Sequence, residues 1–581
     1  YKASADSDTF IAGILYNNNV VDVLYAGSGD VVSLTLSSTG APLGYQYGYT
    51  ASAGTLSGTT LTMPDANVTV NVDTETLRSD GQQHVVSYMT AAGTTRTYDA
   101  IALDGHEAVD ENGYVCLDAG IYYVGTDIAY ANRIRPTGNI TLILADGKTM
   151  TLNGNMWGIY GGSYLTIYGQ SLDAATAGTL RYNGKSDGIN VYKYEQHSGN
   201  VSITTSGSLV RGIVADVTLR GGTLTISANS NNAYAILGTR HSILGGQLTA
   251  TATGTNAIGI YASATGGTAL ALGWTRPADR ITASSISTYG GTVAVVAEGK
   301  TFIDEAGQTY SGIIAQVDQA YAIDGKTLYP YIEGSVPYID ENGQRQLCTQ
   351  YTIFDGQTTL GTGWYVADGT HDYGQAITIN GDVHLILKDN AVMNVGCEEN
   401  PIHGHGIHVK GPSFSIYAQS TGESQGQLHV IASHFDSSAA CGIYAEGSSI
   451  TINGGKVTVN GIYASDIYID NGSVTINGGQ VYADIYSNNE SSVTINGGQV
   501  TAGNIDAPSG VTINGGQVTA KYGGINAIYG NIKLGWTNPT DYIYTDRYNV
   551  TGTLSIAEGK AFINAEGDIY ESGTVNASAI N

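Results

Sequence analysis

The chain has 581 residues and a formal net charge of −26, although only 13% of its residues are charged. The acidic excess argues against binding to nucleic-acid phosphates or to anionic membranes. No apolar run reaches the roughly 18 residues that a transmembrane helix needs. Because so few residues are charged, the surface must consist largely of uncharged polar residues, Gly and Tyr. This composition favours strands and turns over helices.

Residues 1–78 are predicted to form a small all-β module. Between Val31 and Val70, apolar and polar residues alternate in short runs that are broken by Gly and Pro. Such runs are typical of short strands joined by turns. The segment Thr62–Val70 is the last predicted strand of this module.

Residues 79–325 and 326–581 are predicted to be two homologous units, because four segments recur in the same order. Their offsets lie between 243 (385 − 142) and 262 (534 − 272) residues. The matched pairs are Leu142–Asp146 with Leu385–Asp389, Ile167–Ser171 with Ile416–Ser420, Leu272–Asp279 with Leu534–Asp541, and Ala297–Ile303 with Ala557–Ile563.

The Leu-Gly-Trp segment near the end of each unit is predicted to close a stack of strands. End repeats of stacked architectures have atypical sequences, because they must cover exposed strand edges. We expect Trp274 and Trp536 in these segments to be buried capping residues. The alternative function for both rings is a platform for stacking sugars.

A short repeat in the second unit predicts a solenoid. Val-Thr-Ile-Asn-Gly-Gly-Gln-Val occurs at Val474–Val481, Val493–Val500 and Val511–Val518, with a variant at Ile450–Val457. A strand and a Gly-Gly corner recurring every 18–24 residues are typical of stacked repeats. In the first of the three copies, the Val and Ile side chains should point inward and the Thr outward, because alternate residues of a strand face opposite sides. At least one Gly of the corner should have a positive φ.

A second repeated motif, Gly-Ile-Tyr or Ile-Tyr, supplies the candidate ligand-binding residues. Its Ile is expected to face the core and its Tyr the solvent, where the hydroxyl stays hydrated. Exposed Tyr rings beside Asn and Gln amides are suited to weak glycan binding. The candidates are Tyr160, Tyr261, Tyr444, Tyr463 and Tyr486.

Both long units resemble the right-handed parallel β-helix modules of bacterial cell-surface, adhesin-like proteins, in particular the repeat-bearing proteins of gut bacteria. The resemblance rests on Asn139–Lys148, Leu165–Ser171, the Asn-Gly-Gly corners and the Leu-Gly-Trp segments. The N-terminal module is similar to small β repeats of bacterial surface proteins through Met63–Val70. The resemblance implies an all-β fold with two tandem β-helices and an extracellular location on the bacterial surface. It also implies adhesion or display, with glycans or host and bacterial surface proteins as partners.

We expect a non-enzymatic protein, with two alternatives. In the first alternative, the units are subunits of an extracellular fibre, since a solenoid offers two complementary ends for end-to-end self-association. A polysaccharide-cleaving enzyme would need carboxylates on neighbouring strands of one face. Asp466, Asp470 and Asp484 are the candidates for such a convergence. As the chain starts at Tyr1, we expect a mature or excised part of a longer secreted protein.

No cofactor is expected, and structural Ca²⁺ in acidic turns such as Asp110–Gly113 stays an alternative. The segment His403–His408, near Cys397, has the composition of a transition-metal site. Its last two histidines are three positions apart, however, which predicts opposite strand faces and a solvated loop. A disulfide between Cys397 and Cys441 is left open against four separate thiols.

Overall fold

The regular elements of the computed structural model are β-strands, and no helix occurs among the described residues. No described segment forms an apolar helix of membrane-spanning length. Contacts divide the chain into two units, Tyr1–Tyr331 and Ile332–Asn581. The structure describes residues 2–5, 13–16, 19–21, 23–35, 41–57, 60–154, 157–289, 293–315, 323–433, 440–462, 465–488, 490–564 and 567–576.

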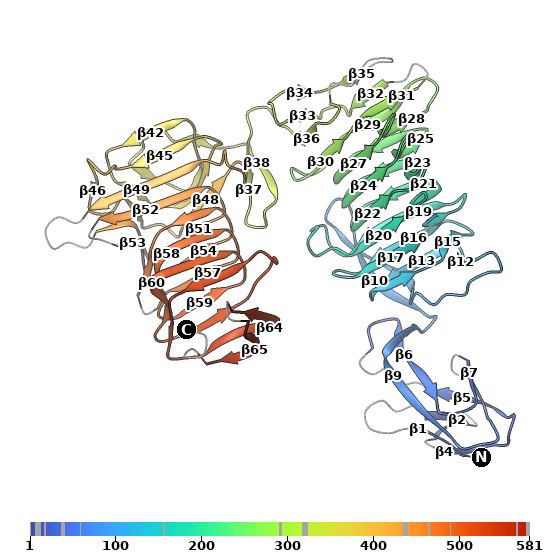
Figure 1. The fold of residues 1–581 in the computed structure, drawn as a ribbon. Helices are drawn as coiled ribbons and strands as arrows, with labels where there is room; N and C mark the ends of the chain where they lie inside the picture. Colours follow the sequence, from blue (N-terminus) through green and yellow to red (C-terminus); the bar gives the residue numbers. More distant parts are fainter. Residues whose placement is uncertain are drawn as a thin grey trace. The chain divides into compact units, whose positions relative to one another are not determined.

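The first part of unit 1 contains two small sheets (Figure 1). These sheets have their own apolar cluster. The cluster consists of Val32, Leu61, Met63, Val68 and Val70. The predicted domain border after residue 78 falls inside β9 (Val68–Ser79). The division of this unit into two domains therefore stays a prediction.

The remainder of unit 1 is built from two long sheets of mostly parallel strands. One contains 17 described strands, from β10 (Gln83–Met89) to β35 (Ile313–Ala315). The other contains 10 described strands, from β14 (Ile128–Tyr130) to β34 (Thr309–Tyr310). Their buried side chains form one continuous apolar core.

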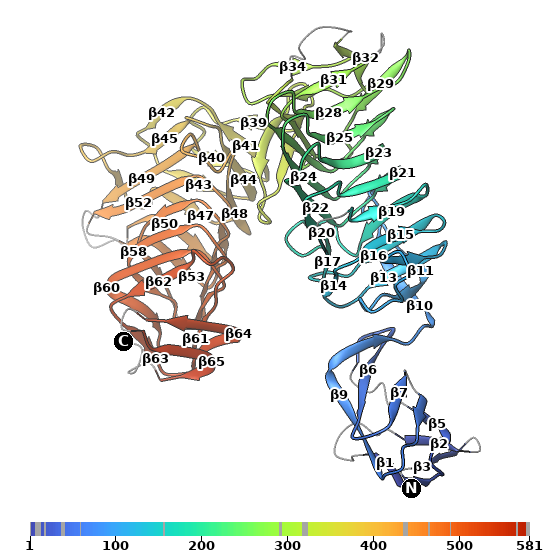
Figure 2. The same cartoon turned by 45° about the vertical axis from the view of Figure 1, so that its right-hand side comes forward.

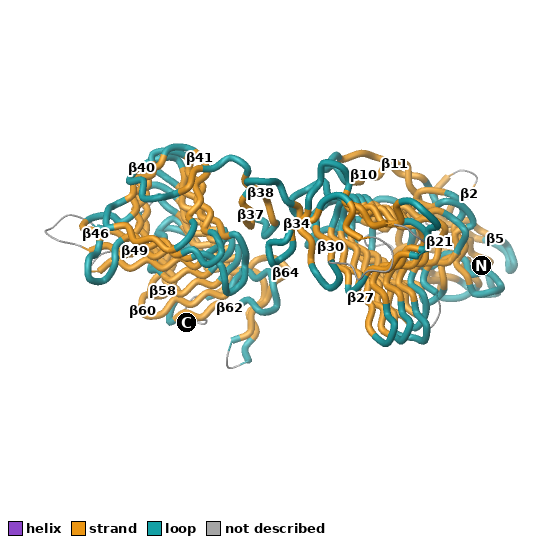
Figure 3. The backbone as a smooth tube through the Cα atoms, turned by 90° about the horizontal axis from the view of Figure 1, so that it is seen from above, coloured by secondary structure: helices purple, strands orange, loops and turns teal. Residues whose placement is uncertain are grey.

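Unit 2 repeats this organisation. Its first sheet contains 11 described strands, from β39 (Thr352–Ile353) to β65 (Ile569–Val575), and its second contains 16. Viewed from above, the strands of unit 2 overlie one another in stacks (Figure 3). The all-β, parallel-rich prediction is thereby confirmed.

The repeated motif of unit 2 places equivalent residues in equivalent positions on successive strands. The strands β51 (Ser449–Ile452), β54 (Ser473–Ile476), β57 (Ser492–Ile495) and β59 (Gly510–Ile513) pair in parallel without a register shift. Val474 and Ile476 are fully buried and Thr475 is half-buried, as the alternation predicts. Each buried aliphatic side chain contributes about 2 kcal/mol of apolar burial.

The Asn-Gly-Gly corners turn the chain and link the repeats. The second Gly of each corner has a positive φ, which confirms the prediction; the values are 87° at Gly455, 81° at Gly479, 79° at Gly498 and 93° at Gly516. The preceding asparagines form a ladder. Each side-chain amide donates to the Asn of the previous corner, at 2.7 Å from Asn477 to Asn453, 2.8 Å from Asn496 to Asn477 and 2.8 Å from Asn514 to Asn496. The polar atoms of the corners thus satisfy one another along the stack.

Antiparallel strands end the parallel stacks in both units, as expected for closing segments. Trp274 and Trp536 occupy equivalent environments there. Each indole N–H donates to a backbone carbonyl, and a lysine ammonium covers one ring face at 3.9 Å (Lys300) or 4.0 Å (Lys560) from the ring centroid. Both rings are half-buried rather than fully buried, so the prediction of buried caps is right in part. The lysines reduce the ring surface that a sugar would need.

The closing segment of unit 1 contains a small charged network. Lys326 Nζ donates to Asp304 Oδ2 and to the hydroxyl of Tyr310, both at 2.8 Å. The hydrogen bond from Lys326 is the main cause that lowers the pKa of Asp304 to about 2, from a usual value of 3.8. Asp304 is therefore ionised in the folded state at pH values where it is protonated in the unfolded chain.

This pair predicts a specific pH dependence of stability. Because the pKa of Asp304 is lower in the folded state, its contribution to the free energy of unfolding is complete above about pH 4. That contribution is lost as the pH falls towards 2. We expect Lys326→Met to lower the thermal unfolding temperature of unit 1 at pH 6, and the difference from the wild type to shrink between pH 4 and pH 2. Calorimetry of both full-length chains would measure it. A constant difference across this range would contradict the assignment.

Candidate functional site

An aromatic row lies on one face of the larger sheet of unit 2, and Figure 2 shows the backbone of this sheet. It lies on β47 (Ile407–Val409), β50 (Cys441–Glu446), β53 (Ser465–Asp470) and β56 (Ile485–Ser487). Parallel pairing without a register shift at these positions aligns His408, Tyr444, Tyr468 and Tyr486. Successive members are therefore about 4.8 Å apart along the stack.

The strand sequence explains why these rings face outward. The residue before each of them is an isoleucine with at most 1% exposure, namely Ile407, Ile443, Ile467 and Ile485. Because side chains alternate along a strand, burial of each Ile directs the next side chain to the opposite face. The three tyrosines are half-buried, and burial raises the pKa of each. They remain neutral hydrogen-bonding groups at physiological pH.

His405 extends the aromatic row, which the sequence analysis did not foresee. Its ring stacks on Tyr444 at 4.4 Å and 17°, and lies 5.0 Å from the ring of His408. The prediction that the two histidines lie on opposite faces is wrong. Gly406 precedes the strand β47, so His405 is not part of that strand and its ring turns to the same side.

The surroundings of the two histidines favour the neutral form of each ring. Burial is the main cause that lowers the pKa of both rings, and the charge of Lys410 adds to it. The nearest opposing charge is the carboxylate of Glu446, 3.5 Å from His408 Nε2. His405 Nδ1 is buried and has no hydrogen-bond partner among the described residues. A ligand hydroxyl that reached this nitrogen would satisfy it.

The aromatic row leads into a polar pocket of about 390 Å³, the Asp506 pocket. The position that follows Tyr486 in register is Asp506, on β58 (Gln499–Asp506), and the next is Asn526, on β60 (Gln517–Ala527). The other polar lining residues are Asp484, Asn504, Tyr522, Arg547 and Asn549.

Asp506 is the least satisfied group in this pocket. Its Oδ1 is buried without a hydrogen-bond partner among the described residues, and burial raises its pKa. Asp484 differs, since its Oδ1 accepts the backbone N–H of Asn504 at 3.1 Å. The amide of Asn526 donates to Asn504 Oδ1 at 2.6 Å and so fixes that side chain. The pocket therefore offers an acceptor at Asp506 and a pre-oriented amide pair.

Tyr522 at the pocket rim has a strained backbone. Its φ is 73°, in the left-handed region, and 87% of its surface is exposed. A bulky residue in this region is rare, and such strain clusters at functional sites. The backbone N–H of Tyr522 donates to Asp546 Oδ2 at 3.1 Å, which helps to hold this conformation.

The three carboxylates singled out in the sequence do not converge as a group. Asp484 lines the pocket, whereas Asp466 accepts the backbone N–H groups of Asp484 and Gly461, both at 2.7 Å. Asp470 accepts the side-chain amides of Asn471 and Asn488. Asp506, which faces the pocket, was not recognised in the sequence. Its register with Tyr486 is the signal that would have identified it.

The predicted tyrosines have different surroundings. Tyr444 and Tyr486 belong to the aromatic row. In unit 1, Tyr160 stacks on Trp157 at 4.2 Å and 20°, and Tyr261 meets Tyr234 edge-on at 5.5 Å. Tyr463 lies outside the described residues. The structure therefore brings two of the five candidates together in one row.

The metal and disulfide alternatives receive no geometric support within the described ranges. No group of three or more His, Cys, Asp and Glu side chains gathers there in a metal-binding arrangement. In the acidic turns, Asp110 and Asp340 use Oδ1 to accept backbone N–H groups at 2.8–3.0 Å, which is ordinary turn chemistry. All four cysteines are free thiols, so Cys397 and Cys441 are not bridged.

Comparisons with protein-family models, with curated proteins and with solved structures found no match.

Proposed function

We propose that the chain is an extracellular bacterial surface protein whose two long units are tandem right-handed parallel β-helices, and that it binds glycans without cleaving them. The long parallel ladders, the repeated Asn-Gly-Gly corners and the antiparallel closing strands support the β-helix reading. The resemblance to adhesin-like proteins supports the location and the role in adhesion or display.

The observation that carries the glycan proposal is the aromatic row ending in the Asp506 pocket. Sugar rings present apolar C–H faces that pack on aromatic rings, and hydroxyls that pair with amides and carboxylates. Tyr444, Tyr468 and Tyr486 form an extended strip of half-buried rings. The ring centroids of Tyr444 and Tyr468 are 6.0 Å apart. Asp506 and Asn526 continue the strip with hydrogen-bonding groups. An extended strip of this kind suits a linear polysaccharide.

Removal of one central ring tests this proposal. We expect Tyr468→Ala to weaken binding of a linear polysaccharide by about tenfold, because loss of one stacking contact costs about 1.4 kcal/mol. The matched control is Tyr482→Ala, on β55 (Gln480–Tyr482) of the same sheet, where the ring is exposed and lies outside the row. Affinity electrophoresis of the full chain against a panel of neutral and acidic polysaccharides would measure both.

Equal affinity of the two variants would refute the aromatic row as a binding surface.

A polysaccharide-cleaving enzyme is the second candidate function, because Asp484 and Asp506 face one pocket and differ in environment. New reducing ends that appear with the wild type and disappear in Asp506→Asn would support cleavage instead. Regular filaments in electron micrographs of the purified chain would support the fibre alternative.

A further inference from the structure

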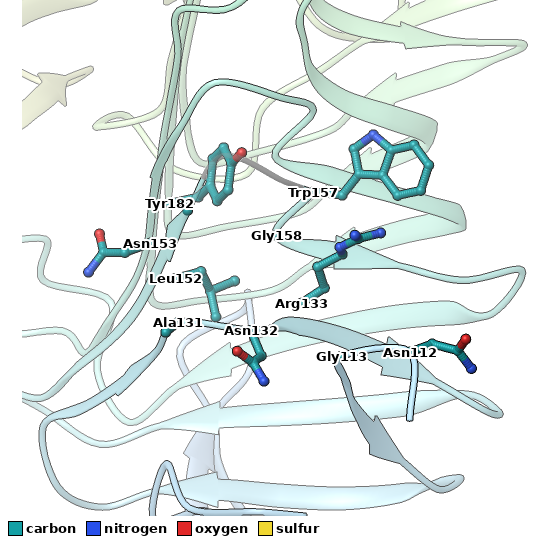
Figure 4. A pocket seen from close by; sticks show the side chains of 11 residues that line it. Asn112, Gly113, Ala131, Asn132, Arg133, Leu152, Asn153, Trp157, Gly158 and Tyr182 are labelled. Carbon is teal, nitrogen blue, oxygen red and sulfur yellow. The ribbon is translucent and has the colours of Figure 1, made fainter. Parts of the chain in front are cut away.

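Unit 1 contains a second polar pocket, of about 160 Å³, around Arg133 (Figure 4). Arg133 lies on β15 (Arg133–Pro136), which pairs in parallel with β12 (Tyr114–Leu117) and with β18 (Ile159–Tyr160). In the figure the guanidinium group lies below the indole of Trp157. The pairing of neighbouring strands therefore creates this site from residues far apart in sequence.

Aromatic rings hold the guanidinium of Arg133 in place. Its central carbon lies 4.8 Å from the ring centroid of Tyr114 and 5.6 Å from that of Trp157. Its Nη1 donates to the Tyr114 hydroxyl at 2.9 Å. Trp157 is itself fixed by stacking on Tyr160. Aromatic stacking orients a guanidinium without neutralising its charge.

The charge of Arg133 has no partner in the described part of the chain. No carboxylate there lies within ion-pairing distance of it, although the chain carries 50 acidic residues and 24 basic ones. Arg211 and Arg220 in the same unit do pair, with Asp187 at 2.6 Å and Glu195 at 2.7 Å. Guanidinium has five N–H donors, and the bond to Tyr114 uses one of them. The others are available to an anion.

The described lining of the pocket contains polar asparagines at its edge and no acidic residue. Asn112, Asn132 and Asn153 line it, and none of their side-chain amides bonds to another described residue. Leu152 and Tyr182 supply an apolar wall. The volume is well below the roughly 300–1,000 Å³ of pockets for drug-sized ligands, so the site admits a single small group or ring.

We propose that the Arg133 pocket binds the carboxylate-bearing ring of an acidic saccharide. A carboxylate matches the planar fork of a guanidinium and pairs with it through two parallel hydrogen bonds. The free N–H groups of the Arg133 guanidinium can also bond a ring hydroxyl, and the Leu152 and Tyr182 side chains, which line the pocket, can contact ring carbons. The site is separate from the aromatic row of unit 2 and adds a preference for acidic sugars.

Binding of three small probes tests the proposal. Titration of the full chain with D-galacturonic acid, D-galactose and inorganic phosphate, followed by saturation-transfer NMR, should show binding of the uronic acid alone. We expect Arg133→Gln to weaken that binding about tenfold or more, because a hydrogen-bonded charge is lost. The matched control is Arg135→Gln, on the same strand. The Arg135 side chain is exposed, lies over the ring of Tyr114 and does not line the pocket.

Each outcome decides a separate point. Equal binding of galactose, or an unchanged affinity in Arg133→Gln, would overturn the proposal. Phosphate binding that is lost in Arg133→Gln would assign the pocket to inorganic anions instead of saccharides. Tyr468→Ala should bind D-galacturonic acid like the wild type, so failure of the polysaccharide assay and failure of this one are distinguishable. Equal thermal unfolding temperatures of both Arg variants would show that the pocket variant is folded.

Discussion

Replacing Gly472 with alanine should destabilise unit 2 by about 3 kcal/mol or more. A Cβ at this position would lie 1.9 Å from the carbonyl oxygen of Ser448 and 2.9 Å from Cγ2 of Ile469. The oxygen belongs to the backbone of the neighbouring repeat, and it precedes a strand that is paired in register on both sides. Relief of the clash therefore requires separation of two paired strands.

The control for Gly472→Ala is Gly422→Ala, at an exposed position of the same unit. A Cβ there would meet no atom within 4 Å, and its φ is outside the left-handed region. Its effect should be within about 0.5 kcal/mol. Hydrogen exchange of unit 2 peptides in the full-length variants would give the local free energies of opening. Similar exchange in both variants would show that the repeats are not packed as closely as the structure indicates.

The repeated segments of unit 2 could be predicted from sequence because several independent signals agree there. Alternation sets which residues are buried, and the Gly-Gly pair marks the corner. The shared order of residues within each copy then places equivalent residues above one another. These signals gave the inward orientation of Val474 and Ile476, and the positive φ at the second Gly of each corner. Local preference and global stacking are consistent in this part of the chain.

The two proposed binding surfaces were harder to predict, because each depends on the pairing of strands with dissimilar sequences. Arg133 meets Trp157 through the register of β15 with β18, and β15 carries no copy of the repeated motifs. Tyr486 leads to Asp506 only once the neighbouring strand is aligned. The position of His405 depends on the chain path before the three-residue strand β47. A single sequence fixes which residues face outward more readily than it fixes which of them become neighbours.

A cavity in the core of unit 2 should be nearly as costly as the clash at Gly472. We expect Ile476→Ala to lower the free energy of opening by about 3–4 kcal/mol, because the side chain is fully buried and the ladder on both sides prevents collapse. Its neighbours in register are Ile452 and Ile495, both fully buried. Thr475→Ala, one position away on the outer face, is the matched control and should change stability by about 0.5 kcal/mol or less.

The same ladder predicts which second substitutions will couple to Ile476→Ala. Ile495 contacts the new cavity from the adjacent strand, so the costs of Ile476→Ala and Ile495→Ala should not add. Ile416 lies two strands away on β48 (Ser413–Ala418). The free-energy costs of Ile416→Ala and Ile476→Ala should therefore add to within about 0.5 kcal/mol. Hydrogen exchange of the two double variants would measure both energies. Additivity in the first pair would contradict a stack in which each repeat is stabilised by its immediate neighbours, since such a stack couples adjacent repeats most strongly.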